Sequence, residues 1–66
     1  MKDYNDIRMF DRNGQLMWHR HFKDSNEAYK EFNRMKNISQ KEYNGVADKT
    51  GRFVKTNSHS IELSKY

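Results

Sequence analysis

The alternation of apolar and polar positions predicts a β-hairpin near the N-terminus. Two runs rich in apolar and aromatic side chains, residues 7–10 and 16–22, flank the sequence Asp-Arg-Asn-Gly at positions 11–14. Short runs of this kind are typical of β-strands, and an Asn-Gly pair tolerates the positive φ angles that tight hairpin turns require. We therefore expect two antiparallel strands joined by a tight turn.

Two registers of this hairpin fit the turn. A type I turn with a bulge at Gly14 would pair Asp11 with Gln15. A two-residue loop at positions 13 and 14 would instead collect most of the apolar side chains on one face. A buried face selects the register, because a slip by one residue turns every side chain over. We therefore favour the two-residue loop, which pairs Arg12 with Gln15, Phe10 with Met17, Met9 with Trp18 and Arg8 with His19.

The favoured register gives the hairpin an apolar face and a basic face. We expect Trp18 to be the largest core side chain, with Arg20 as the one charge on its face. The competing interpretation makes Trp18 an exposed anchor at an interface. The apolar face carries Ile7, Met9, Leu16, Trp18 and Phe22. The basic face carries Arg8, Phe10, Arg12, Met17, His19 and His21.

A helix is predicted to follow the hairpin. Asp24 or Ser25 can cap its N-terminus, and Asp24 with Glu27 has the spacing of a capping box. Because poor helix formers begin at Asn37, we expect the helix to end near Lys36 or Asn37. An apolar stripe at helical spacing would face a sheet, and it consists of Ala28, Tyr29, Phe32 and Met35.

The last third of the chain predicts a second hairpin. Residues 48–54 repeat the pattern of residues 11–17: acid, base, polar residue, glycine, polar residue and two apolar residues. We therefore expect a turn that joins residues 43–47 to residues 52–56. Whether the hairpins are an internal duplication stays open, because unrelated hairpins share such turn residues. Ile61 and Leu63 alternate with polar residues and predict either a short edge strand or a frayed end.

These patterns predict one small α+β domain over residues 1–66. Two hairpins would form one antiparallel sheet in the order ββαββ, with room for a short fifth strand and a single helix packed on one face. A chain of 66 residues buries only about 60% of its unfolded surface, so the domain should be marginally stable. The other face of the sheet is left to solvent or to a partner.

Composition indicates the cellular compartment in which the protein is expected. The chain has no cysteine, which excludes disulfides and thiolate metal sites. It has no signal-peptide pattern at its start and no apolar run close to the about 20 residues that cross a bilayer. We therefore expect a soluble, cytoplasmic protein without membrane contact.

Charge favours an anionic partner. Lys and Arg number 13 against 9 Asp and Glu, a net charge of +4. Cations on the basic face of the first hairpin can hold phosphates, and an exposed Phe10 can stack on bases. The same cations also keep an open sheet face soluble, but that role does not need Phe10. Lys49, Arg52 and Lys55 near the second turn could extend this surface. The candidate binding residues are Arg8, Phe10, Arg12, His19, His21, Lys49 and Arg52.

Catalytic and metal-binding patterns are weak. The chain has no Gly-rich phosphate loop, no G-x-S-x-G and no H-E-x-x-H, so we expect no enzyme activity. His19 and His21 lie on one side of a strand, as in some Zn²⁺ or Cu²⁺ sites. A closed site needs four ligands, which His59, Asp11 or Glu62 would have to complete. We therefore expect no metal and no cofactor.

One short stretch shows a local resemblance to a known domain type. The stretch from Trp18 to Ala28, with Phe-Lys-Asp-Ser-Asn-Glu before the alanine, resembles the strand-to-helix corner of the three-stranded DNA-binding domains at the N-terminus of phage-type integrases. The strands predicted after the helix depart from that pattern. The resemblance therefore assigns no role to any residue.

Three functions follow as hypotheses. The leading one is a small non-enzymatic domain that binds DNA or RNA through the basic and aromatic face of its sheet. The alternative is a protein-interaction module, a small inhibitor or adaptor, that docks the same face or an edge strand onto an acidic protein surface. The third is a homodimer whose sheet faces or edges pair.

Overall fold

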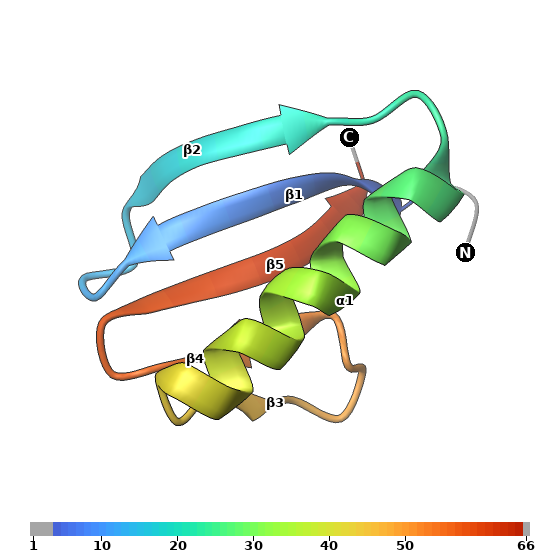
Figure 1. Cartoon of the computed structure of the whole chain (residues 1–66). Helices are drawn as coiled ribbons and strands as arrows, with labels where there is room; N and C mark the ends of the chain where they lie inside the picture. Colours follow the sequence, from blue (N-terminus) through green and yellow to red (C-terminus); the bar gives the residue numbers. More distant parts are fainter. Residues whose placement is uncertain (1–3, 66) are drawn as a thin grey trace.

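The computed structural model describes residues 4–65 and contains one sheet and one helix. The elements follow in the order β1 (Tyr4–Asp11), β2 (Leu16–His21), α1 (Ser25–Glu42), β3 (Val46–Ala47), β4 (Phe53–Lys55) and β5 (His59–Lys65). All strands join one antiparallel sheet in the order β2-β1-β5-β4-β3, and α1 lies across one face of it (Figure 1). The predicted α+β class, the two hairpins and the single packed helix are confirmed.

The place of β5 corrects the sequence interpretation. We expected a short edge strand or a frayed end, but β5 has seven residues and lies between β1 and β4, so that it joins the two hairpins into one sheet. Its alternating Ile61 and Leu63 are buried, and they pair with Met9 and Ile7 of β1. Two alternating apolar residues identify a strand, but its neighbours in the sheet depend on long-range pairing that a local pattern does not contain.

The first hairpin combines both registers considered above. At the turn, the Asp11 N–H donates to the Gln15 carbonyl (2.9 Å), and Gly14 has a φ of +84°. This is the bulged turn that we did not favour. It is stabilised by the Asp11 carboxylate, which accepts hydrogen bonds from the backbone N–H groups of Asn13 and Gln15.

A second irregularity restores the favoured register within the strands. Phe10 pairs with Leu16, and Met17 is an extra residue, after which Met9 pairs with Trp18. The predicted pairs Met9–Trp18 and Arg8–His19 are therefore confirmed, whereas the pairs Phe10–Met17 and Arg12–Gln15 are wrong. Because paired residues share a face, Leu16 lies with Phe10 on the side away from the helix.

The second turn repeats the chemistry of the first. The Asp48 carboxylate accepts hydrogen bonds from the Thr50 hydroxyl and from the N–H groups of Thr50 and Gly51, and Gly51 has a φ of +74°. These bonds, led by that of the Thr50 hydroxyl and aided by the charge of Arg52, lower the pKa of Asp48. The loop is longer than the first, because the Asp48 N–H reaches the carbonyl of Phe53, five residues on. In both turns, the aspartate that begins the repeated pattern accepts backbone hydrogen bonds.

The helix begins as predicted but ends later. Asp24 caps it by accepting the Asn26 N–H (3.0 Å), and the last helical residue is Glu42 rather than residue 36 or 37. The buried stripe continues to Ser39, and this polar residue conceals the extra turn from a search for apolar spacing. Among the residues that the structure describes, no helix is long and apolar enough to cross a membrane.

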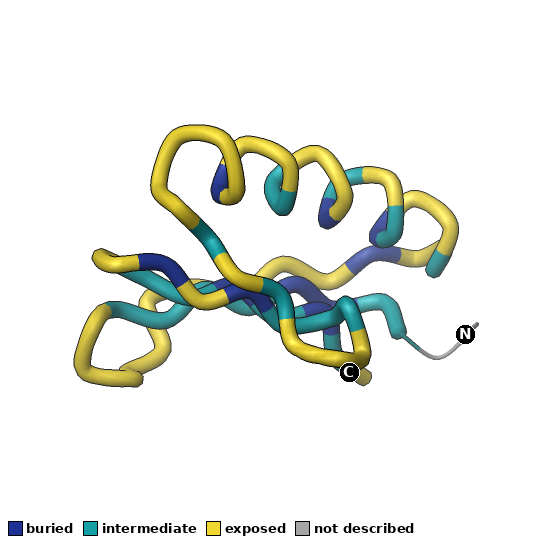
Figure 2. The backbone as a smooth tube through the Cα atoms, turned by 90° about the horizontal axis from the view of Figure 1, so that it is seen from below, coloured by how far each residue is buried: buried dark blue, intermediate teal, exposed yellow. Residues whose placement is uncertain are grey.

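The core lies between the helix and the central strands. Buried segments of both layers face each other, while the outer helix surface and the turns are exposed (Figure 2). The predicted stripe is confirmed in Ala28 and Phe32, which are buried, and in Tyr29 and Met35, which are partly buried. The buried apolar cluster consists of Ile7, Phe22, Ala28, Phe32, Val54, Ile61 and Leu63.

The expected burial of β2 is wrong. Trp18 is 41% exposed and Leu16 is 53% exposed, although both were assigned to the core. The helix runs diagonally over β5 and makes its main contacts with β1 and β5, so most of β2 projects beyond its cover (Figure 1). Phe22, the residue that follows β2, reaches the core.

Candidate binding surfaces

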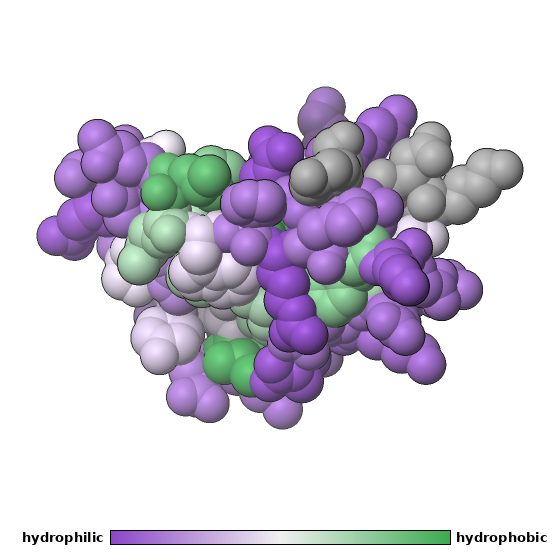
Figure 3. Space-filling view, turned by 90° about the horizontal axis from the view of Figure 1, so that it is seen from above, coloured by the Kyte–Doolittle hydropathy of each residue, from purple (hydrophilic) through white to green (hydrophobic). Residues whose placement is uncertain are grey.

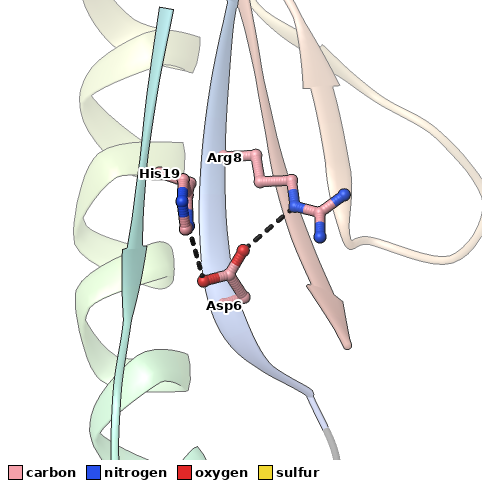
Figure 4. Close-up of polar contacts among 3 residues, drawn as sticks. All are labelled: Asp6, Arg8 and His19. Carbon is pink, nitrogen blue, oxygen red and sulfur yellow. Dashed lines mark hydrogen bonds and ion pairs between the residues drawn. The ribbon is translucent and has the colours of Figure 1, made fainter. Parts of the chain in front are cut away.

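An unexpected carboxylate lies beside Arg8 and His19 of the predicted basic face. Asp6 of β1 is fully buried on the side of the sheet away from the helix. Its two carboxylate oxygens are held by Arg8 Nε at 3.0 Å and by His19 Nδ1 at 3.2 Å (Figure 4). The sequence contained a signal for this site, because Asp6 and Arg8 are two residues apart on a strand and Arg8 pairs with His19.

This cluster changes the charge of the face. A buried carboxylate is costly unless it is paired and hydrogen-bonded, and Arg8 and His19 satisfy that requirement. The guanidinium of Arg8 therefore neutralises Asp6 and adds no net charge to the surface. The cluster is better explained as a structural ion pair than as a phosphate site.

The other predicted cations do not gather at one place. Arg12 lies in the β1–β2 turn, whereas Lys49 and Arg52 lie in the β3–β4 turn at the opposite end of the sheet (Figure 1). The Arg52 guanidinium stacks over the Tyr4 ring at 4.3 Å from its centroid. His21 lies at the far end of β2, where it pairs with Asp6.

Two phenylalanines share the open face of the sheet. Phe10 of β1 and Phe53 of β4 line a shallow hollow of about 320 Å³. Sequence reasoning did not include Phe53, because the strand phase of the second hairpin could not be fixed from its turn. An adjoining hollow of about 350 Å³ shares Phe53 and adds Arg12 and Lys55. Of the predicted residues, the structure brings Phe10 and Arg12 together here.

The second surface is the outer edge of the sheet. β2 is an edge strand, and all six of its residues are exposed, among them Met17 at 58% and Trp18 at 41%. Seen from this edge, apolar atoms gather at the end of the strand near the β1–β2 turn, surrounded by hydrophilic atoms (Figure 3). Long edge strands with exposed apolar side chains are uncommon, because they invite another strand to pair.

The backbone of β2 is oriented for such pairing. The Phe22 N–H donates to the Asn5 carbonyl (2.8 Å), which makes residues 22 and 5 a hydrogen-bonded pair. Such pairs alternate along an antiparallel ladder. The backbone groups of Trp18 and Arg20 therefore point to β1, and those of His19 point to the open edge.

The charge of β2 is entirely basic. Its sequence Leu-Met-Trp-His-Arg-His contains no carboxylate. The Arg20 guanidinium lies 4.8 Å from the centroid of the Phe22 ring, rather than over Trp18 as its shared face suggested. A hydrogen bond from Arg34 lowers the pKa of Glu31 on the helix, and the charge of Arg20 adds to this effect. Arg20 therefore extends along the helix side of β2.

Comparison with known proteins adds no assignment. No family model matches this chain, and no curated protein or solved structure is significantly similar to it. Among residues 4–65, no three His, Asp or Glu side chains lie together in a way that would hold a metal ion. The function must therefore be inferred from the two surfaces themselves.

Proposed function

We propose that this protein is a non-enzymatic interaction module that binds an extended, acidic segment of another protein along β2. The observation that carries the proposal is the exposure of Leu16, Met17 and Trp18 on an edge strand. Leu, Ile, Val and Phe make up only eleven of the 66 residues. Leu16 is one of these eleven residues, and Met17 and Trp18 lie beside it outside the core, where a partner can bury all three side chains.

The strand supports addition of a β-strand. An extended segment that pairs with β2 would form backbone hydrogen bonds with His19 and continue the sheet. On the helix side, alternate residues of the segment would face Trp18 and Arg20, because these two residues share a face. We therefore expect an apolar residue opposite Trp18 and an acidic residue two positions away, opposite Arg20.

Selection from a random peptide display library tests the partner class. We expect the enriched peptides to contain acidic residues at alternate positions beside an apolar residue. In NMR titrations, the largest amide shifts should fall on residues 16–21. Enrichment of basic peptides, or shifts centred on the outer surface of α1, would contradict the proposal.

A pair of substitutions at His19 separates the backbone from the side chain. His19→Pro removes the N–H that faces the open edge without removing a bond to β1, and should weaken binding of a selected peptide at least about tenfold. His19→Ala loses the same contact with Asp6 but keeps the N–H, so its affinity should stay within about threefold. Fluorescence anisotropy with a labelled peptide measures both, and circular dichroism checks folding.

Two outcomes would overturn this proposal. Equal affinity of the proline and alanine variants would show that the edge N–H is not used. A wild-type dimer in sedimentation that His19→Pro converts to a monomer would assign the edge to a second copy of the chain.

A further inference from the structure

The face of the sheet away from the helix carries a second surface that the proposed function does not use. Phe10 and Phe53 are both partly exposed there, on strands separated by β5. They line the same hollow of about 320 Å³, together with Gly14, Ser60 and Glu62. Aromatic rings on an uncovered sheet are suited to stack on nucleic-acid bases.

Cations lie on one side of this aromatic pair. Arg12 and Lys55 line the adjoining hollow of about 350 Å³, which shares Gly14, Phe53 and Ser60 with the first. Both cations are exposed, and no ion pair joins either of them to a carboxylate of residues 4–65. Arg12 comes from the β1–β2 turn and Lys55 from β4, so the fold and not the local sequence brings them together.

The nearby carboxylates orient a ligand rather than exclude it. Glu62 lines the aromatic hollow and pairs across the sheet with Arg8 and Phe53. Asp11 lines the basic hollow, but its carboxylate already accepts two backbone hydrogen bonds. An uncharged base is therefore favoured beside Glu62, and a phosphate is favoured on the side of Arg12 and Lys55.

We infer that this face binds a short single-stranded nucleic acid. Bases stack on Phe10 and Phe53, and the neighbouring phosphates lie near Arg12 and Lys55. The site differs from the surface expected from the sequence. Phe53 is added, and of the three cations expected near the second turn only Lys55 takes part, because Lys49 and Arg52 lie at the far end of the sheet. Arg8 takes no part, because it neutralises Asp6. The edge strand β2 takes no part in it.

Charge reversal tests the site with a matched control. Lys55→Glu and Lys30→Glu change the net charge equally, but Lys30 lies on the exposed surface of α1. In anisotropy titrations with labelled decathymidine and decauridine, we expect Lys55→Glu to weaken binding at least about fivefold and Lys30→Glu less than about twofold. Comparison of the two oligonucleotides distinguishes DNA from RNA as the preferred ligand.

Salt dependence counts the phosphates. With two phosphate contacts, the slope of log affinity against log salt should be about −1.4 for a single strand, so affinity should fall about sevenfold between about 50 and 200 mM salt.

Phe53→Leu tests base stacking. The substitution keeps an apolar side chain but removes the aromatic ring, and should weaken oligonucleotide binding about tenfold.

Oligonucleotide binding and peptide binding along β2 can be tested independently. His19→Pro should bind the oligonucleotides as the wild type does. Equal weakening by Lys55→Glu and Lys30→Glu would indicate attraction to net charge alone and would overturn the site. Absence of binding by the wild type at about 50 mM salt would do the same.

Discussion

Replacing Phe32 with alanine is expected to lower the free energy of unfolding by about 3–5 kcal/mol. Phe32 is 1% exposed and is the largest fully buried side chain of the core. The core of a domain this small rarely supplies more than about 3–5 kcal/mol in total, so this loss is as large as the whole contribution of the core. We therefore expect most of the variant to be unfolded without denaturant.

Circular dichroism during thermal and urea unfolding measures this effect. Met17→Ala is the control, because Met17 is 58% exposed and its replacement should change the unfolding free energy by less than about 0.5 kcal/mol. A Phe32→Ala variant with a cooperative transition near that of the wild type would show that the helix and sheet do not pack as described.

Replacing Arg8 with methionine is expected to have the second-largest effect. The substitution leaves the fully buried Asp6 carboxylate in contact with His19 Nδ1, at 3.2 Å, but without its guanidinium partner. A buried charged group that loses a hydrogen-bonded partner costs about 1–3 kcal/mol. Because Arg8 is itself partly exposed, we expect the lower half of that range.

A double-mutant cycle tests the origin of this cost. Asp6→Leu combined with Arg8→Met leaves no unpaired buried charge, so the double variant should be more stable than Arg8→Met alone. Urea unfolding gives the free energies, and Lys30→Met controls for the loss of an exposed cation. If Arg8→Met were no more destabilising than Lys30→Met, the pairing with Asp6 would contribute nothing to stability.

Local sequence patterns predicted the elements but not their arrangement. The helix cap at Asp24 and the glycine turns depend only on residues close together in the sequence. The helix and both hairpins could therefore be located from local patterns. The central position of β5 depends on pairing with β1 residues that are 48 to 61 positions away in the sequence. The full length of α1 was missed because Asn37 and Ser39 are poor helix formers, although Ser39 occupies the last buried position of the helix.

The same limit applies to the candidate surfaces. The register predicted that Arg8 and His19 would be neighbours, but not that they would enclose Asp6. The exposure of Trp18 was missed because the alternation of apolar and polar residues shows on which face of the sheet a side chain lies. It does not show how much of that face the helix covers. Phe53 was missed because it joins Phe10 only through β5.

The positive charge of β2 would make its edge selective for acidic partner strands. Charges on an edge strand act against uncontrolled pairing between copies of a protein. The Arg20 guanidinium would repel a second basic strand and attract an acidic one. Charge thus explains how an exposed apolar edge can remain available to one class of partner.

Amide exchange at His19, followed by NMR, tests the central claim most directly. If β2 is the open edge, the His19 amide should exchange much faster than the Arg20 amide in the free protein and become protected when a selected acidic peptide binds. A His19 amide as protected as that of Arg20 in the free monomer, or one that stays unprotected in the peptide complex, would contradict the account.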